Sequence, residues 1–202
     1  MKPLKIIQPK DYVVYDTLLP KELCDSISNY FINIQSREGT AVNSDDYRKC
    51  EIKWADLNNW IGPFIWQYIQ QTNDRVFQYD LTRASITEIH EIKYHPGNYY
   101  HWHCDDCVGH QIQYEPPSFL SARPGVEEYV RKLAFSLQLS NEEDYTGGEI
   151  QIIQDTQSMM ETVPKKRGTL VIFDSRTRHR IKPVKSGIRY VLVGWVIGPR
   201  WK

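Results

Sequence analysis

A run of short β-type segments in the second half of the chain constrains the fold most strongly. These segments are rich in β-branched and aromatic residues or alternate between apolar and charged residues, and turn-forming residues separate them. They cover residues 84–95, Leu133–Ser140, Glu149–Gln154, Gly168–Asp174 and Arg189–Ile197. Many short strands joined by turns are typical of a β-sandwich or a jelly roll.

The first part of the chain has a helical pattern instead. In the segment Leu18–Ile34, apolar residues recur every four positions and form one helical stripe, and a proline suits the first turn. The stripe consists of Leu19, Leu23, Ile27 and Phe31. The segment Trp54–Asn73 predicts a second helix with a break at Gly62-Pro63. No third helix is expected.

The two patterns together predict a mainly β fold with flanking helices. We expect residues 1–202 to form a single domain with helical support over about residues 1–80 and a jelly-roll core over about residues 83–200, against which the N-terminal helices pack. The long segment Cys107–Lys132 has no clear periodicity and reads as an insertion between strands, where function often resides.

Charge and hydropathy exclude several classes of partner. The chain has 25 basic and 25 acidic residues, so its formal charge gives no reason to expect binding to nucleic acid or to an anionic membrane. No apolar run approaches the ~20 residues of a membrane span, and the first residues lack the apolar stretch of a signal peptide. We therefore expect a cytoplasmic protein whose four cysteines are reduced.

Residues 101–110, HWHCDDCVGH, contain seven potential metal ligands. In a regular strand, His101, His103 and Asp105 would share one face, so a site that uses this strand should draw on that set. His103 and Asp105 form a His-x-Asp pair, and His179 is the best candidate for a third ligand because it follows a predicted strand. Two imidazoles and one carboxylate leave open positions on a metal ion, which suits Fe(II) oxygen chemistry.

Arg189 supplies a second requirement of such a site. It lies ten residues after His179, at the start of the last predicted strand. A guanidinium in a pocket binds a carboxylate through two hydrogen bonds. An acid that chelates the metal and carries a distal carboxylate, such as 2-oxoglutarate, would span the distance from the metal to Arg189.

These residues belong to a larger pattern with a clear resemblance. The stretch YHPGNYYHWHCD supplies Tyr-x-x-Gly-x-x-Tyr-x-x-His-x-Asp, YTGGEI supplies a Gly-Gly-Glu turn, and a distal block runs from Gly168 to Trp195. Over roughly residues 83–195 the sequence resembles the prolyl 4-hydroxylase-like branch of the Fe(II)/2-oxoglutarate dioxygenases, and within it the bacterial and phage PKHD-type hydroxylases. The resemblance implies a double-stranded β-helix.

The resemblance also implies roles for residues. His103, Asp105 and His179 would ligate Fe(II), and Arg189 would bind the distal carboxylate of 2-oxoglutarate. Tyr94 falls in the cosubstrate pocket, Gln138 takes the place of a polar cosubstrate-binding residue, and Trp195 walls the site. In the strand Leu133–Leu139, the polar face that carries Gln138 is expected to line the pocket.

The activity implied is hydroxylation of a protein or peptide, with proline as the favoured residue. 2-Oxoglutarate and O2 would be converted to succinate and CO2, with ascorbate as the reductant. Two alternatives stay open: the same chemistry on another peptidyl residue or on a small molecule, and a non-catalytic module that binds 2-oxoglutarate. The substrate and the oligomeric state are not specified by the sequence.

Other metal and redox motifs fit this stretch less well. Cys104-x-x-Cys107 lacks the βαβ setting of a thioredoxin-like dithiol, and a structural zinc site usually needs two such pairs. A cupin site would combine His101 and His103 with a glutamate four or five residues later, where Cys107 and Val108 stand.

Overall fold

A computed structural model describes most of the chain. It covers residues 11–39, 47–56, 58–81, 88–105, 129–154, 159–199 and 201. Most of the predicted insertion Cys107–Lys132 lies outside these residues, and so do three potential ligands of the 101–110 stretch, Asp106, Cys107 and His110.

The larger of two main sheets has seven antiparallel strands. Their order across the sheet is β1 (Tyr12–Tyr15), β11 (Leu170–Asp174), β7 (Tyr129–Gln138), β14 (Arg189–Pro199), β5 (Glu88–Tyr94), β4 (Glu51–Trp54) and β2 (Arg37–Glu38). All five segments predicted to form strands do so, and four of them (in β5, β7, β11 and β14) are neighbours in this sheet.

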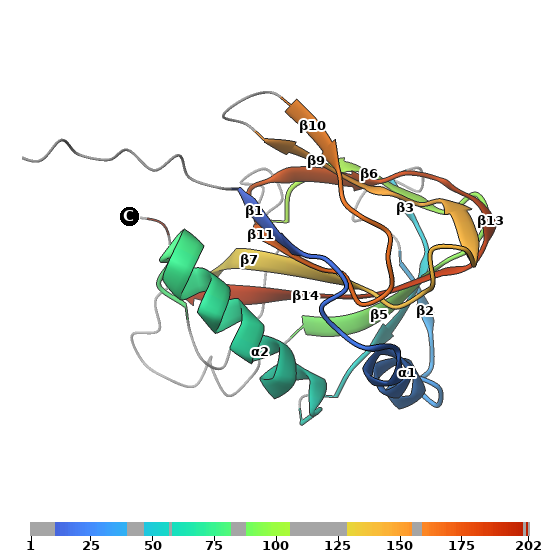
Figure 1. Ribbon diagram of the computed structural model, residues 1–202, viewed down its shortest axis with the longest axis horizontal. Coiled ribbons are helices and arrows are strands. Elements are labelled where there is room, and N and C mark those ends of the chain that lie inside the picture. Colours follow the sequence, from blue (N-terminus) through green and yellow to red (C-terminus); the bar gives the residue numbers. More distant parts are fainter. Residues whose placement is uncertain are drawn as a thin grey trace, which may run out of the picture.

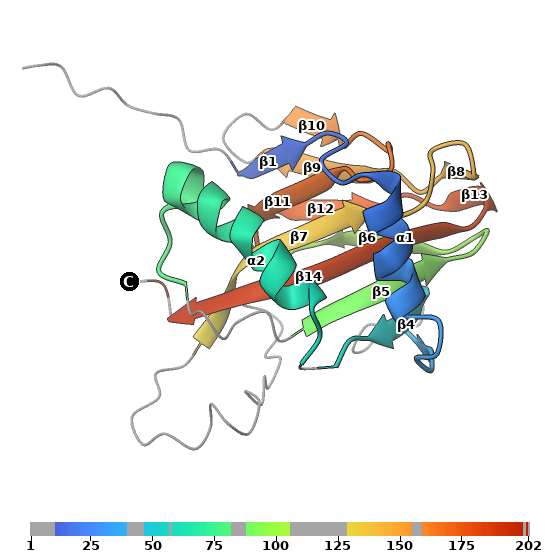
Figure 2. The same cartoon turned by 60° about the horizontal axis from the view of Figure 1, so that its bottom comes forward.

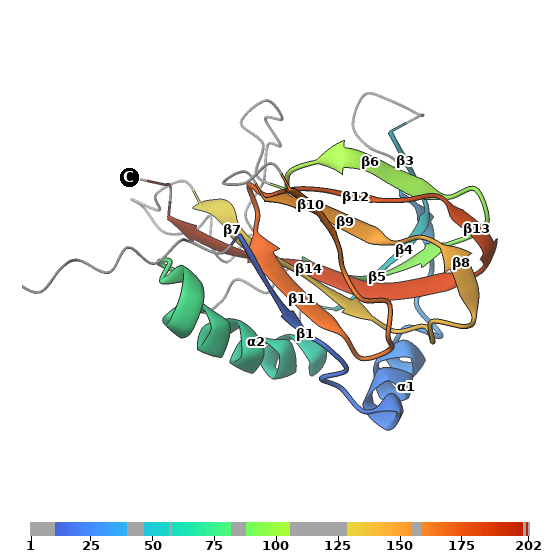
Figure 3. The same cartoon turned by 45° about the horizontal axis from the view of Figure 1, so that its top comes forward.

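The second sheet lies over one face of the first (Figure 1). Its five antiparallel strands follow the order β10 (Met159–Thr162), β9 (Ile150–Gln154), β12 (Arg178–Ile181), β6 (Tyr99–His103) and β3 (Arg48–Lys49). A short pair, β8 (Tyr145–Gly147) with β13 (Val184–Gly187), completes the strands at one end (Figure 3). This double-layered antiparallel arrangement is the jelly roll that the sequence predicts.

The helices cover the other face of the seven-stranded sheet, as Figure 2 shows. They are α1 (Lys21–Tyr30) and α2 (Ile61–Thr72), and a π-helical turn, η1 (Asn73–Phe77), continues α2. Three residues of the predicted stripe of α1 are buried (Leu19, Ile27 and Phe31), together with Cys24. They pack with Ile61, Ile65 and Ile69 of α2 in one apolar core against the sheet.

Two details of the N-terminal part differ from the sequence prediction. The second helix begins at Ile61, so Gly62-Pro63 stands in its first turn, where proline is tolerated, and does not break it. Of the predicted helical residues before it, Trp54 is the last residue of β4, and residues 55, 56 and 58–60 are not helical. The segment expected to be helical also contributes strands β1 to β4, which are two to four residues long and lie at or near sheet edges.

The space between the two sheets holds a second core that is partly polar. Along β7, Leu133, Phe135 and Leu137 face the helices, while Ala134, Ser136 and Gln138 face the other sheet, as predicted. The apolar members facing inward include Ile92, Val171, Val191, Ile152 and Ile181. Within the described residues, no helix is long and apolar enough to cross a membrane.

Candidate metal centre

Two of the candidate metal ligands are a cross-strand pair of histidines. His103, the last residue of β6, lies opposite His179 of β12 in the antiparallel register. Asp105 follows β6 by two residues, and its backbone N–H donates to the Ser175 carbonyl at 2.8 Å. Strand pairing therefore positions the two imidazoles, and a backbone hydrogen bond to the β11–β12 turn positions the carboxylate.

A β-bulge in β6 decides which side chains face the interior. Ile181 pairs with Tyr100 and His179 with His103, so three steps along β6 match two along β12. The bulge turns Tyr100 to the same side as His103, and the two rings stack with centroids 3.5 Å apart. His101 is exposed and does not join the cluster of ligand atoms formed by His103, Asp105 and His179.

The three side chains converge on a common point. Their ligand atoms all lie within 4.8 Å of one another. The Asp105 carboxylate oxygens lie 3.7 Å from Nε2 of His103 and 3.7 Å from Nε2 of His179. Of the candidates in residues 101–105, only His103 and Asp105 join this group among the residues that the structure describes.

The tautomer of each imidazole suits metal binding. Nδ1 of His103 lies 2.7 Å from the His101 carbonyl, and Nδ1 of His179 lies 3.0 Å from the Thr177 carbonyl. A carbonyl can only accept, so each Nδ1 carries a proton, and Nε2, the atom on the side of Asp105, is the one that can act as a metal ligand. Such hydrogen bonds orient metal-bound histidines.

The protonation states also match a metal site. Burial and the neighbouring His179 lower the pKa of His103 to about 3, so this imidazole is neutral at pH 7. Burial alone would raise the pKa of Asp105, but His179 and His103 hold it below its usual value, helped by the Trp195 indole N–H that donates to the carboxylate. Nε2 of His103 and the Asp105 carboxylate therefore carry no proton at pH 7, as ligands of a divalent cation must.

Arg189 forms the far end of the same interior. It opens β14 opposite Tyr94 of β5 and is 1% exposed. Its Nε donates to Oε1 of Gln138 at 3.2 Å, and Nε2 of Gln138 donates to the Tyr145 hydroxyl at 3.0 Å. Within the described part of the chain, Nη1 of Arg189 has no hydrogen-bond partner and no carboxylate pairs with the guanidinium.

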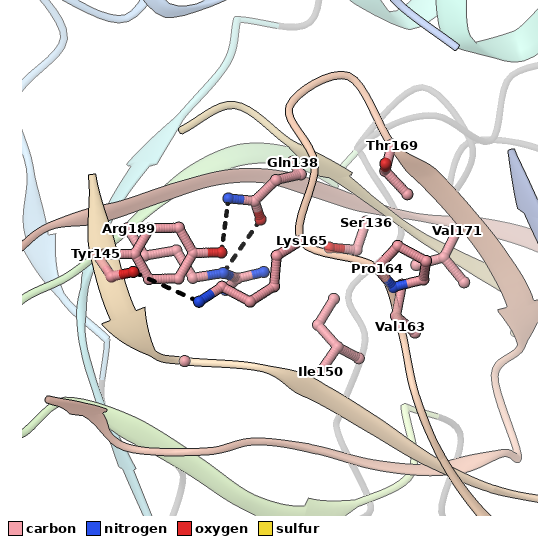
Figure 4. Close-up of a pocket in the computed structure, with 11 residues that line it drawn as sticks. Ser136, Gln138, Tyr145, Ile150, Val163, Pro164, Lys165, Thr169, Val171 and Arg189 are labelled. Carbon is pink, nitrogen blue, oxygen red and sulfur yellow. Dashed lines mark hydrogen bonds between the residues drawn. The ribbon is translucent and has the colours of Figure 1, made fainter. Parts of the chain in front are cut away.

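A pocket opens beside this guanidinium (Figure 4). Gly148 lies at its edge with φ +64°, and a Cβ there would meet Arg189 Cδ at 3.1 Å and Val184 Cγ2 at 2.9 Å. Glycine is therefore needed both for the backbone and for the space. The lining residues are Ser136, Gln138, Tyr145, Gly148, Ile150, Val163, Pro164, Lys165, Thr169, Val171 and Arg189.

Tyr145 and Lys165 are among the lining residues that the sequence reasoning did not single out. Tyr145 contacts both Gln138 and Arg189, and Lys165 lies over the Tyr145 ring at 4.2 Å. Tyr145 stands two residues before Gly147-Gly148, so the position of that turn could have identified it. Lys165 precedes β11 in a connection without periodicity, and no sequence signal identifies it.

The remaining predicted residues also lie in this interior. Tyr94 is 1% exposed, and the Arg189 guanidinium lies 5.4 Å from its ring centroid. Burial raises the pKa of the Tyr94 phenol, so it is neutral. Trp195 packs at the metal end, with the His90 ring 5.1 Å away and the Arg131 guanidinium 3.8 Å away. The structure thus gathers all seven predicted residues between the two sheets.

Comparison with known proteins identifies one family model and a set of related hydroxylases. Residues 89–197, more than half of the chain, match the family model described as the 2OG-Fe(II) oxygenase superfamily. A PKHD-type hydroxylase of Hyphomonas neptunium is 45% identical over 64 residues, which cover 32% of this chain and 28% of that protein. The chain therefore matches less than a third of the length of this curated relative.

Solved structures share the fold at low sequence identity. A prolyl-4-hydroxylase of Pseudomonas putida superposes with a TM-score of 0.65 at 18% identity, covering 95% of this chain and 94% of that one. A Trichoplax adhaerens prolyl hydroxylase, solved with a peptide fragment of hypoxia inducible factor, gives a TM-score of 0.66 at 16% identity, covering 93% and 84%.

Proposed function

The chain belongs to the 2OG-Fe(II) oxygenase superfamily, and from that premise we propose that it is an Fe(II)- and 2-oxoglutarate-dependent hydroxylase of a protein or peptide, with a prolyl residue as the favoured target. The observation that carries the proposal is the convergence of His103, Asp105 and His179 in the same interior as a buried Arg189 that pairs with no carboxylate of the described residues. We further propose that residues 1–202 act as one oxygenase domain.

The three converging side chains fit Fe(II). Two imidazoles and one carboxylate on one side of an ion leave its other positions open, which is the donor set of non-haem iron oxygenases. In the proposal, Nε2 of His103, Nε2 of His179 and a carboxylate oxygen of Asp105 hold the iron. When bound, the iron supplies the oxidising chemistry that converts 2-oxoglutarate and O2 to succinate and CO2 as the substrate is hydroxylated.

The Arg189 pocket fits the distal carboxylate of 2-oxoglutarate. Nη1 of Arg189 is buried without a hydrogen-bond partner in the described residues, which is costly unless a ligand meets it. The Tyr145 hydroxyl lies beside the Arg189 guanidinium and adds a second hydrogen-bond donor for the carboxylate. Gln138 accepts a hydrogen bond from Nε of Arg189 and so orients the guanidinium. These residues would bind and orient the cosubstrate, and the apolar walls from Ile150, Val163 and Val171 would exclude water.

The peptide substrate is supported by the neighbours in fold. Prolyl hydroxylases superpose on nearly the whole chain, and one of them was solved with a peptide fragment. Because their sequence identity is under 20%, they support the fold directly and the prolyl target only by analogy.

The decisive experiment measures succinate. The purified chain with Fe(II), ascorbate and 2-oxoglutarate should form succinate slowly even without substrate, and a peptide substrate should accelerate this and gain one oxygen by mass spectrometry. Ascorbate is included as the proposed reductant and should be tested by omission. Absence of succinate, together with absence of metal-dependent 2-oxoglutarate binding, would refute the proposal; binding without succinate would indicate a non-catalytic module.

A further inference from the structure

Arg48 is a second cation in contact with the metal centre. It lies in β3, directly opposite Tyr100 of β6. Its guanidinium carbon is 4.7 Å from the centroid of the Tyr100 ring, and that ring stacks on His103 at 3.5 Å with an interplanar angle of 19°. Tyr100 therefore connects the Arg48 guanidinium to an imidazole of the ligand set.

The charge of Arg48 has no counter-charge in the described residues. Its Nε donates to the Cys50 thiol at 3.2 Å, a weak acceptor, and no carboxylate of the described chain lies within ion-pair distance. Burial raises the pKa of Cys50, of Tyr94 and of Tyr100, so the groups beside the guanidinium are neutral at pH 7. Arg48 is partly buried rather than enclosed in the core.

Other arginines near the site are accounted for. Arg131 pairs with Glu88 at 2.6 Å. Arg189 pairs with no carboxylate of the described residues, and the proposed function assigns it to 2-oxoglutarate. Its guanidinium lies 5.4 Å from the centroid of the Tyr94 ring, and the charge of Arg48 also acts on the Tyr94 phenol. In the proposed function, the distal carboxylate of 2-oxoglutarate pairs with Arg189 and the carboxylate of Asp105 binds the metal. Neither carboxylate is then available to balance the charge of Arg48.

We propose that Arg48 makes the site selective for substrates that carry a carboxylate close to the carbon that is oxidised. A guanidinium binds a carboxylate through two parallel hydrogen bonds, and one unmatched cation calls for one anionic group. The carboxylate belongs either to an acidic residue next to the target in a peptide or to a free amino acid. The inference rests on the proposed function and specifies its substrate class.

The test uses matched probes that differ in charge. Blocked pentapeptides with a central proline flanked by glutamate are compared with the same peptides carrying glutamine, and free L-proline is compared with L-prolinamide. Oxygen addition is followed by mass spectrometry in the presence of Fe(II), ascorbate and 2-oxoglutarate. The wild-type chain should favour the acidic member of at least one pair by tenfold or more in kcat/KM, and the favoured pair identifies the source of the carboxylate.

The variants assign this preference to Arg48. Arg48→Gln should reduce the acidic preference to within twofold, whereas Arg48→Lys should retain part of it. Both should raise the 2-oxoglutarate concentration needed for substrate-free succinate formation far less than Arg189→Gln does. Arg180→Gln is a matched control, because Arg180 lies 4.7 Å over the ring of Trp102 on the outward side of β12, and it should keep the wild-type preference. Thermal melting verifies that each variant is folded.

Three results would overturn the inference while leaving the proposed function standing. The first is succinate formation in which neither acidic probe is oxidised in preference to its neutral partner. The second is an acidic preference that survives in Arg48→Gln. The third is a rise in the 2-oxoglutarate requirement of Arg48→Gln as large as that of Arg189→Gln, which would place Arg48 in the cosubstrate site. Failure of the wild-type chain to form succinate would instead refute the proposed function, and the inference with it.

Discussion

His103 and His179 are direct cross-strand partners in the β6–β12 pair, and Asp105 approaches both at 3.7 Å. Opposite residues of an antiparallel pair have closely spaced Cβ atoms, so sheet pairing brings two of the three candidate ligands together before any ion binds. Each ring is also held by a backbone carbonyl through Nδ1. Strand pairing and these backbone hydrogen bonds therefore position the three candidate ligands close together.

Removal of any one of these three side chains should abolish tight iron binding. His103→Ala, Asp105→Ala and His179→Ala should each weaken Fe(II) binding by at least about a hundredfold, because second-sphere changes alone cost about 10- to 100-fold. Iron content after dialysis and titration calorimetry measure this. His101→Ala is the matched control, since His101 is exposed and supplies only its backbone carbonyl to His103. Equal iron loss in this control would contradict the assignment.

Arg189 should affect the cosubstrate and not the metal. Arg189→Gln removes the buried cation, and loss of one partner of a buried charge pair costs about 2–5 kcal/mol, so we expect the 2-oxoglutarate concentration for half-maximal succinate formation to rise by at least about 30-fold. Gln138→Ala should have a smaller effect of the same kind, because Gln138 orients the Nε side of the guanidinium. Iron loss as the main defect of Arg189→Gln would show that its proposed role is wrong.

Much of this arrangement could be predicted from sequence because it depends on local periodicity. The alternation in Leu133–Ser140 specified which face of β7 carries Ser136 and Gln138, and the β-rich segments gave the strands of the sheet around Arg189. The grouping of His103, Asp105 and His179 followed from the motif spacing, and the structure brings these residues together. Their roles in binding iron and 2-oxoglutarate stay predictions.

The β6 bulge and the short strands β1 to β4 could not be predicted from the sequence, because they depend on pairing with strands that are distant in the chain. The β6 bulge exists because Tyr100 and His103 pair with Ile181 and His179, and no local pattern in residues 99–103 marks the extra residue. For that reason simple alternation along residues 99–105 does not describe the pairing of this strand. Strands β1 to β4 have two to four residues, too few to show a period, and they are stabilised by the longer strands they join.

Trp195 should tune the affinity for iron through Asp105. The indole N–H donates to the carboxylate, whereas the ring packs against His90 and Arg131. Trp195→Phe keeps an aromatic ring and removes the donor, so we expect Fe(II) affinity to fall by about tenfold. Trp102→Phe, on the outward side of the same centre under Arg180, is the control and should bind iron like the wild type. Unchanged affinity in Trp195→Phe would show that the indole N–H does not contribute.

Glu91 should make the fold less stable as the pH rises. It lies in β5 on the helix-covered face and is 4% exposed, and burial raises its pKa from 4.5 to about 7 despite the attraction of Lys53 and Lys93. The folded chain therefore holds this proton more tightly than the unfolded chain. The stabilisation is complete below pH 4.5 and is lost as the pH rises through 7.

Comparison with Glu91→Gln isolates this effect. Gln keeps the size of the side chain and does not ionise, so between pH 4.5 and pH 7.5 the wild type should lose about 2–3 kcal/mol of unfolding free energy relative to the variant. Urea unfolding at several pH values measures the difference. Glu142→Gln, at an exposed turn, should run parallel to the wild type across the same range. A difference between wild type and Glu91→Gln that does not change with pH would mean that Glu91 ionises at its ordinary value.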